Sequence, residues 1–433
     1  MNTAPDISLE SGNKERYRSY SSAFSFVVLA SLASFITYSC MYGFRKPYTA
    51  SSYDGYSLFG ISYKSVLVIT QALGYMSGKF YGIKFIATIS PEKRARSIFI
   101  IIGIAWLSLL LFAVIPPPYN FFLLFINGFP LAMVWGLVFS YLEGRKVTEI
   151  AGAILATSII FASGLAKTVG KWLMLSLHIS EWWMPFAAGV VFVVPLVVCV
   201  MLLNTLPPPS EKDIEHRTLR KPMDKQDRKL FLKRFGLALI PIIISYGMLT
   251  ILRDFSEDFS NELWKEVGLG HYASIFVNTS TLVSLIVLGA VILLFFIKNN
   301  YKAFQLNHVA ILIGFGLMIG ATVLYSSGEI SPVAWMIAGT SGLYLGYMPF
   351  NCFYFERLLA AYKVQGNVGF VMYIADSFGY LGTVLVLLVK EFQHLNYSWV
   401  SVFKFLFYGG SVIGIALTIA GWLLFRKVYT KWE

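Results

Sequence analysis

The sequence predicts an all-α polytopic membrane protein with twelve transmembrane helices in two six-helix pseudo-repeats. Of its 433 residues, 57% are hydrophobic and 13% are charged, whereas a soluble domain carries about 25% charged residues. Apolar runs near the ~20 residues that a bilayer requires recur along the whole chain. Alternating strands of an outer-membrane barrel are absent from the sequence, so helices are expected to satisfy the backbone in lipid.

The expected elements follow from these runs in order. A polar tail covers residues 1–22, and the first apolar run after it is too long for a signal peptide, so it is interpreted as a retained helix. Residues 23–205 form the first bundle, 206–233 a basic linker, 234–425 the second bundle and 426–433 a tail. The expected spans are 23–48, 61–87, 97–116, 119–141, 148–176, 183–205, 234–256, 272–297, 305–327, 332–356, 364–390 and 401–425.

The net charge of +12 is explained by membrane orientation rather than by nucleic-acid binding. Alternate connections carry the basic residues, for example Lys93, Arg94 and Arg96 after the second span. This asymmetry predicts that both termini and the linker are cytoplasmic, most simply in the plasma (inner) membrane. The three cysteines all lie in apolar segments without a CxxC motif, so no disulfide, metal site or cofactor is expected.

Two arginines stand out because they repeat. Arg45 follows Tyr38 by seven residues late in the first predicted span, and Arg253 follows Tyr246 by seven residues late in the seventh. Buried arginine usually faces a cavity or a partner, so both are predicted to bind a substrate at a common centre. The alternative for Arg45 is snorkelling to the interface. Lys46 is interpreted as interfacial, and Lys167 as unrelated to the site.

Other ionisable residues divide into gating and site candidates. Asp376 lies well inside the eleventh span, where it must pair with a cation or carry a proton. Lys79 lies either in the cavity or at the cytoplasmic interface. Ion pairs that latch the halves are predicted at inner helix ends, from Glu143, Arg145, Glu356 and Arg357. Candidates for lining the cavity are Tyr38, Tyr42, Tyr246 and Trp135.

Four patches resemble one branch of the major facilitator superfamily, the organophosphate:phosphate antiporters. Residues 42–47, Tyr-Gly-Phe-Arg-Lys-Pro, resemble the signature of their first helix, in the form of the sugar-phosphate exchangers. Residues 74–80 resemble the second helix of the branch, in which a lysine lines the cavity. Residues 252–258 resemble the seventh helix, which supplies the second substrate arginine, and residues 378–382 resemble the eleventh helix. The chain departs from the branch in the loop at 89–94 and in lacking a histidine near Phe161.

The resemblance implies secondary active transport of a small organic anion, phosphorylated and exchanged for inorganic phosphate, by alternating access between halves. It also implies that the second and eleventh spans pack together, from which an Asp376–Lys79 ion pair is predicted. Alternatives are a proton-coupled symporter of a sugar or carboxylate that uses Asp376, and a transporter-like sensor. No nucleophile–base pair indicates an enzyme. Expected partners are the anion and the lipid bilayer, with no nucleic acid, and the chain is expected to be a monomer.

Overall fold

The computed structural model describes residues 23–143, 148–207, 225–364, 368–392 and 398–430. The first half contains α2 (Ala23–Tyr42), α3 (Tyr63–Thr88), α4 (Arg94–Val114), α5 (Leu123–Leu131), α6 (Val134–Leu142), α7 (Thr148–Ser176) and α8 (Met184–Asn204). The second contains α10 (Lys225–Asp258), α11 (Ser260–Glu266), α12 (Ile275–Phe295), α13 (Asn300–Ser326), α14 (Pro332–Cys352), α15 (Tyr354–Ala361), α16 (Val368–Phe392) and α17 (Trp399–Thr430). Short pieces are η1 (Pro47–Ala50), η2 (Pro91–Lys93), β1 (Ser57–Leu58) and β2 (Ile61–Ser62).

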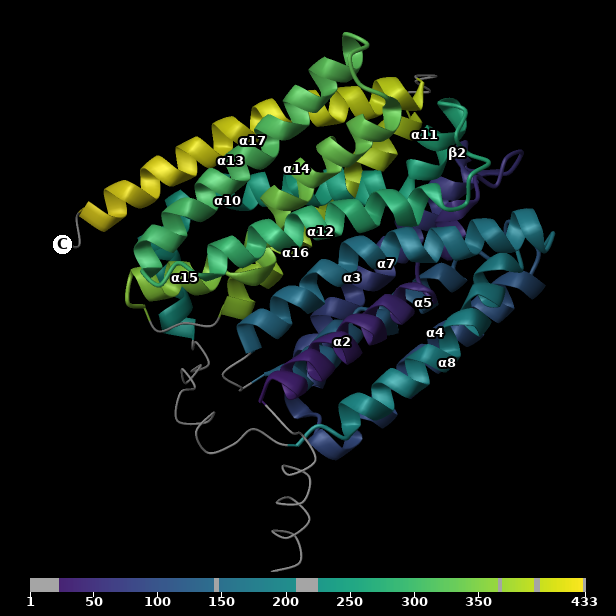
Figure 1. Ribbon diagram of the computed structural model, residues 1–433, viewed down its shortest axis with the longest axis horizontal. Coiled ribbons are helices and arrows are strands. Elements are labelled where there is room, and N and C mark those ends of the chain that lie inside the picture. The colour runs from purple at the N-terminus through teal and green to yellow at the C-terminus, as the bar shows by residue number, and fades with distance from the viewer. Residues whose placement is uncertain (1–22, 144–147, 208–224, 365–367, 393–397, 431–433) are drawn as a thin grey trace, which may run out of the picture.

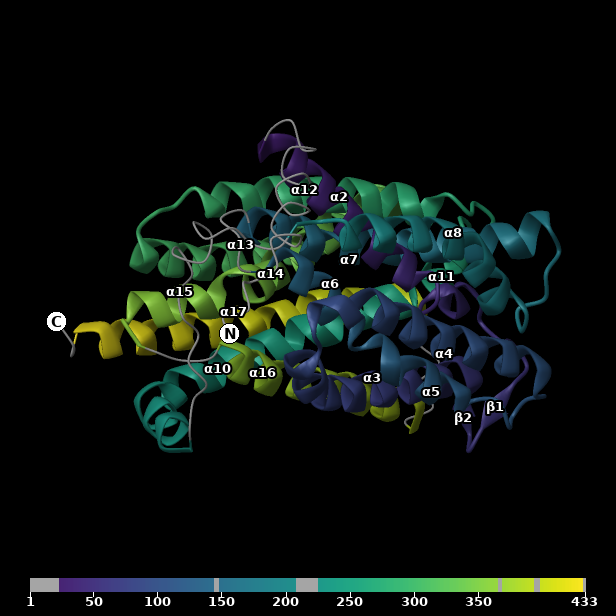
Figure 2. The ribbon, with the colours of Figure 1, turned by 90° about the horizontal axis from the view of Figure 1, so that it is seen from below.

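The two halves lie side by side, and their long helices run in roughly the same direction. Figure 1 shows α2–α8 together below and α10–α17 together above. The halves meet along two seams, α7 against α12 and α3 against α16. Figure 2 shows these seams on opposite sides of the molecule. The predicted packing of the second span beside the eleventh is therefore confirmed, and side chains between the seams come from both halves.

The first predicted span is wrong at its end, because α2 stops at Tyr42 and not at residue 48. Pro47 lacks a backbone N–H, so it cannot donate the hydrogen bond that would continue the helix. The chain tightens before that proline, with Arg45 N bonded to Tyr42 O at 3.0 Å and Lys46 N to the same oxygen at 2.8 Å. Arg45 thus lies in a turn beyond its helix, whereas Arg253 lies within α10.

Several other predicted spans are divided or extended. The fourth consists of α5 and α6, with Pro130 next to the break, because proline removes a helical hydrogen bond and its ring clashes with the preceding turn. The tenth breaks at Phe353 into α14 and α15. Helix α10 begins at Lys225, inside the segment predicted as linker, because straight-chain basic residues such as Lys229 and Lys233 favour helix.

Eight segments of the described chain are long and apolar enough to cross a membrane, by length and composition: those at α4, at α5–α6, and at α7, α8, α10, α12, α13 and α17. Helices α2 and α16 contribute shorter apolar stretches. The less apolar spans carry polar groups that meet at the centre, such as Lys79 in α3 and Asp376 in α16. An integral, multi-pass membrane protein follows from this set of helices.

Small residues in the second-helix motif permit the closest helix packing in the first half. A Cβ built on Gly74 would lie 2.3 Å from Phe125 O, and one on Gly78 would lie 1.9 Å from Phe129 O. Both contacts are with the backbone of α5, so α3 and α5 touch only because these positions lack side chains. The position of Lys79 on α3 depends on this packing.

Candidate functional site

The turn that carries Arg45 is held by two buried amide side chains. Gln71 of α3 donates from Nε2 to Arg45 O at 2.8 Å and to Asn127 Oδ1 at 2.9 Å. Asn127 of α5 donates to Phe44 O and to Ala105 O, each at 3.0 Å. The bonds to Arg45 O and Phe44 O satisfy carbonyl groups that the end of α2 leaves without helical partners. The backbone at Arg45 is therefore attached to its neighbouring helices.

Two tyrosines form the contact between the halves beside both arginines. Tyr75 of α3 and Tyr380 of α16 have ring centroids 5.7 Å apart. The guanidinium carbon of Arg45 lies 3.8 Å from the centre of the Tyr75 ring, and that of Arg253 lies 5.7 Å from the centre of the Tyr380 ring. Cation–π attraction of this kind is strengthened when the groups are removed from water.

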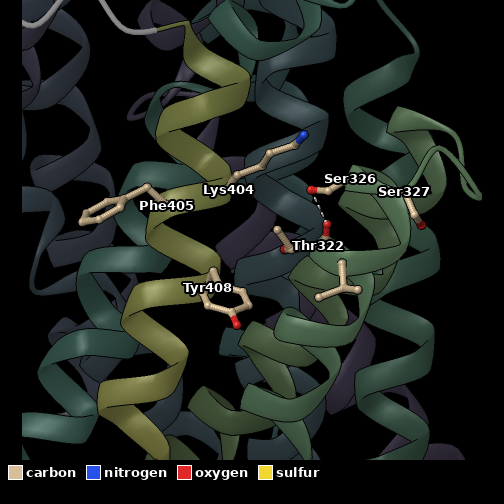
Figure 3. A pocket seen from close by; sticks show the side chains of 7 residues that line it. Thr322, Ser326, Ser327, Lys404, Phe405 and Tyr408 are labelled. Carbon is tan, nitrogen blue, oxygen red and sulfur yellow. Dashed lines mark hydrogen bonds between the residues drawn. The ribbon is translucent and has the colours of Figure 1, made fainter.

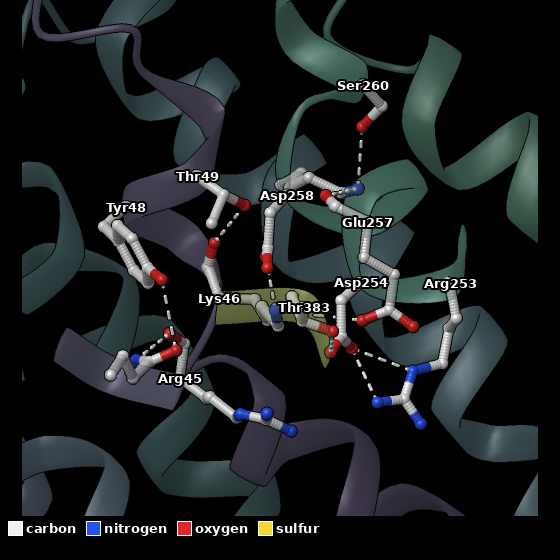
Figure 4. Close-up of polar contacts among 12 residues, drawn as sticks. Arg45, Lys46, Tyr48, Thr49, Arg253, Asp254, Glu257, Asp258, Ser260 and Thr383 are labelled. Carbon is white, nitrogen blue, oxygen red and sulfur yellow. Dashed lines mark hydrogen bonds and ion pairs between the residues drawn. The ribbon is translucent and has the colours of Figure 1, made fainter. Parts of the chain in front are cut away.

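Arg45 and Arg253 are both buried, with 7% and 6% of their surfaces exposed. The snorkelling alternative for Arg45 is therefore wrong. Figure 4 shows the two side chains extending into the same space, Arg45 from the first half and Arg253 from α10. We refer to this arrangement of Arg45, Arg253, Tyr75 and Tyr380 as the arginine site.

The predicted ion pair between Lys79 and Asp376 is confirmed. Lys79 also lies 5.2 Å from the centre of the Tyr380 ring, so it belongs to the interior and not to the cytoplasmic interface. The hydroxyl of Tyr246 donates to the same carboxylate, and its ring stacks on Tyr347 with centroids 5.4 Å apart. Asp376 thus connects α3, α16 and α10 through three side chains.

A second set of polar contacts joins the halves at the end of the molecule that carries residues 46–62 and α11, which we call the α11 end. Lys46 forms an ion pair with Asp258 and lies 3.9 Å from Glu257, as Figure 4 shows. The interpretation of Lys46 as interfacial is wrong, because only 3% of the residue is exposed. Lys64 pairs with Glu262, 2.6 Å away.

Two lysines of α7 extend this set. Lys167 donates to Glu257 O at 2.7 Å and to Ser260 Oγ at 2.9 Å. It therefore joins the halves at the α11 end, and its prediction as unrelated to the substrate site stays a prediction. Lys171 donates to Asn261 Oδ1 at 3.1 Å. In these four contacts the first half contributes the cation and the second half the acceptor; in the exposed pair of Lys265 with Asp54 the order is reversed. Together they close the α11 end.

The remaining predicted residues occupy varied surroundings. Tyr42 lies under Arg45, with 5.5 Å between guanidinium and ring centre, and Tyr38 packs edge-on against Tyr42. Trp135 stacks on Phe139 with centroids 5.0 Å apart. Arg145 lies outside the described residues. Arg357 donates to Asn300 at 2.6 Å within its own half, so the latch of Arg357 and Glu356, like that of Glu143, stays a prediction.

Two hollows accompany these contacts. One of about 60 Å³ lies between α7, α10, α12 and α14, and its lining includes Lys167, Glu257 and Tyr344. The other, of about 610 Å³, lies between α13 and α17 and is lined by Thr322, Lys404 and Tyr408 among others, as Figure 3 shows. Phe405 beside it is 75% exposed. This larger hollow is a groove on the outer surface of the bundle, so we place the candidate site at the arginines.

Most of the acidic residues at the centre were missed by sequence reasoning, although a signal was present. Four acidic residues follow Arg253 in the sequence. The first is Asp254, and the others come three, four and eight residues after it: Glu257, Asp258 and Glu262. In a continuous helix such spacing places side chains on one face; in the structure α10 ends at Asp258 and Glu262 lies in α11. No metal-binding group of three or more His, Cys, Asp or Glu residues occurs among the residues described.

The arrangement of the two halves and of their seams is the fold of the major facilitator transporters. The chain is similar in structure to a D-xylose–proton symporter (TM-score 0.58, 15% identity, covering 92% of this chain and 97% of that one). It is also similar to the nucleoside transporter NupG (0.58, 14%, 93% and 99%) and to the human organic anion transporter MFSD10 (0.54, 14%, 92% and 98%).

The chain belongs to the family described as "Family of unknown function (DUF5690)", whose model matches residues 47–428. A comparison with curated proteins found no match.

Proposed function

We propose that this protein is a secondary active transporter of a small organic anion, most simply a phosphorylated metabolite. The observation that supports it best is the pair of buried arginines contributed by opposite halves beside Tyr75 and Tyr380. Arginine stays charged when it is desolvated, and its planar fork donates paired hydrogen bonds to oxyanions. An anion between the two would interact with both halves at once.

Transport would follow by alternating access around this site. A bound anion that attracts Arg45 and Arg253 together favours the state in which the halves are closed on it, and no covalent step is needed. The four sequence patches that resemble organophosphate:phosphate antiporters support exchange for inorganic phosphate. The fold shared with the organic anion transporter MFSD10 is compatible with an anionic substrate.

The proposed topology has both termini and the 206–233 linker in the cytoplasm, with bundles at 23–205 and 234–425 in the plasma (inner) membrane. In this orientation the α11 end faces outwards, so its ion pairs close the outer entrance. The transporter is proposed to act as a monomer, with the anion and the bilayer as its partners.

Uptake by purified protein in lipid vesicles tests the proposal. Vesicles loaded with inorganic phosphate should accumulate labelled phosphate or an organic phosphate ester from outside. Arg45→Lys and Arg253→Lys should each reduce uptake about tenfold or more, because an ammonium cannot reproduce the paired donors. Arg426→Lys is the control, since Arg426 is exposed at the end of α17. Normal uptake by both site variants would contradict the proposal.

A second candidate is proton-coupled symport of a sugar or carboxylate. It is favoured by the buried carboxylate of Asp376, which is 8% exposed and contacts Lys79 and Tyr246. A pH gradient should then drive uptake, and Asp376→Asn should abolish that uptake while exchange persists. A non-translocating sensor would bind the anion and show neither activity.

A further inference from the structure

Arg253 already holds an anion that belongs to the chain. The carboxylate of Asp254 accepts at Oδ1 from Arg253 Nε at 3.0 Å and from its terminal nitrogen at 2.6 Å. Its other oxygen accepts from Thr383 Oγ1 of α16 at 2.9 Å. The remaining terminal nitrogen of Arg253 donates to the hydroxyl of Tyr347. The edge of the guanidinium that would bind an oxyanion in paired fashion is therefore occupied, as Figure 4 shows.

Arg45 differs from Arg253 in this respect. Its Nε atom is buried without a hydrogen-bond partner. Among the residues that the structure describes, no carboxylate lies within ion-pair distance of Arg45, and its guanidinium contacts the rings of Tyr75 and Tyr42 instead. An unfilled donor on a buried cation is a site for an acceptor, since leaving it unpaired is unfavourable.

Around the arginine site, Asp254 pairs with Arg253, Asp376 with Lys79, and Asp258 with Lys46. Two further buried groups, Glu257 and Lys167, offset each other in charge, and the Glu257 carboxylate lies 3.9 Å from Lys46. Arg45 is then the one cation of this set that has no matching carboxylate. Removing an unpaired charge from water is strongly unfavourable. The centre in this state is therefore matched to one added negative charge and not to two.

We propose that Asp254 is a specificity-determining residue that competes with the substrate for Arg253. It makes the arginine site select a singly charged oxyanion group, held first by Arg45. A doubly charged group can form hydrogen bonds with Arg253 only if it displaces the carboxylate of Asp254. This inference rests on the proposed function, because it concerns the anion at the same two arginines.

The geometry allows such a displacement. Arg253 and Asp254 are consecutive residues of α10, and consecutive side chains of a helix do not face each other. Their contact thus depends on the reach of the arginine side chain and not on the helix. A carboxylate released from Arg253 keeps a partner in Thr383, so it would not be left without a hydrogen bond.

Two tetrahedral oxyanions of different charge test the inference: sulfate, which is doubly charged, and methanesulfonate, which is singly charged. Neither changes its charge near neutral pH. Binding to the purified full-length protein in detergent is measured by calorimetry. The wild type should bind methanesulfonate at least as tightly as sulfate. Asp254→Asn should raise sulfate affinity about tenfold or more, the size of a close charge effect, and change methanesulfonate affinity less.

Two further variants separate this role from a general effect of charge. Asp258→Asn removes the same charge one turn along α10 but leaves Arg253 occupied. A shift in the sulfate-to-methanesulfonate ratio as large as that of Asp254→Asn would overturn the inference. Thr383→Val removes the other hydrogen bond of Asp254 and should shift the ratio in the same direction, by less, even if Asp254→Asn does not fold.

The outcomes also separate the inference from the proposed function. Anion binding that Arg45→Ala abolishes, together with an unchanged ratio in Asp254→Asn and Thr383→Val, overturns the role of Asp254 and leaves the proposed function in place. Sulfate binding that appears only in the Asp254 variant supports the inference. If neither the wild type nor that variant binds either anion, both proposals fail.

Discussion

The Nζ atom of Lys64 lies 2.6 Å and 2.7 Å from the two carboxylate oxygens of Glu262, a residue of the opposite half. The lysine also donates to Thr49 O at 2.8 Å, and the two side chains are 3% and 9% exposed. Removing two charges from water offsets most of their attraction, so the intact pair adds little stability. Its effect on the protein is to join the halves at the α11 end.

The first prediction concerns this pair. Lys64→Met and Glu262→Gln should each lower the free energy of unfolding by about 3 kcal/mol or more, because each leaves a buried charge alone. The double variant should lose less than the sum. Thermal unfolding of the four proteins in detergent measures this. The control is the pair of Lys265 with Asp54, whose side chains are 45% and 81% exposed. The corresponding substitutions there should change the free energy of unfolding by less than about 1 kcal/mol. Additive losses for Lys64 and Glu262 would contradict the prediction.

The second prediction concerns Lys79 and Asp376. Asp376→Asn combined with Lys79→Gln should impair uptake less than either single change, because the pair neutralises both charges in the membrane. The measurement is vesicle uptake by the wild type and three variants. If Asp376 carries protons instead, neutralising Lys79 would not rescue pH-driven uptake in Asp376→Asn.

The third prediction tests the packing of α3 on α5. Gly78→Ala should destabilise the protein by about 2 kcal/mol or more, because the new Cβ would lie 1.9 Å from Phe129 O and neither backbone can move freely. Gly103→Ala is the matched control. A Cβ there meets nothing within 4 Å, and alanine favours helix over glycine by about 1 kcal/mol. Equal melting temperatures for the two variants would show that α3 and α5 are less tightly packed.

The fourth prediction concerns orientation. After Cys40, Cys199 and Cys352 are replaced, a cysteine at Tyr119 should react with a membrane-impermeant reagent added outside intact cells. Tyr119 is 70% exposed between α4 and α5, in a connection predicted to face outwards. A cysteine in the 206–233 linker should react only after the cells are opened. Labelling of the linker from outside would reverse the proposed topology.

Sequence reasoning found the features that depend on composition and local pattern. Long apolar runs predicted the helices because lipid requires every backbone group to be bonded within its own segment. The seven-residue spacing from tyrosine to arginine, repeated in both halves, identified Arg45 and Arg253. The fold buries both beside the pair of Tyr75 and Tyr380. The cation expected beside Asp376 was also named correctly as Lys79.

The tertiary structure decided how the charges are distributed among partners. From the sequence alone, Lys46 is interpreted as interfacial and Lys64 is not singled out. Each pairs with a carboxylate of the other half, more than 190 residues away in the chain. Periodicity along one helix can show that Asp254 and Asp258 of α10 share a face, but not what that face touches. Whether a buried charge is neutralised depends on atoms brought within a few ångströms by packing of distant helices. For that physical reason only the tertiary structure shows that the guanidinium of Arg253 is bonded to Asp254, whereas the Nε atom of Arg45 has no hydrogen-bond partner.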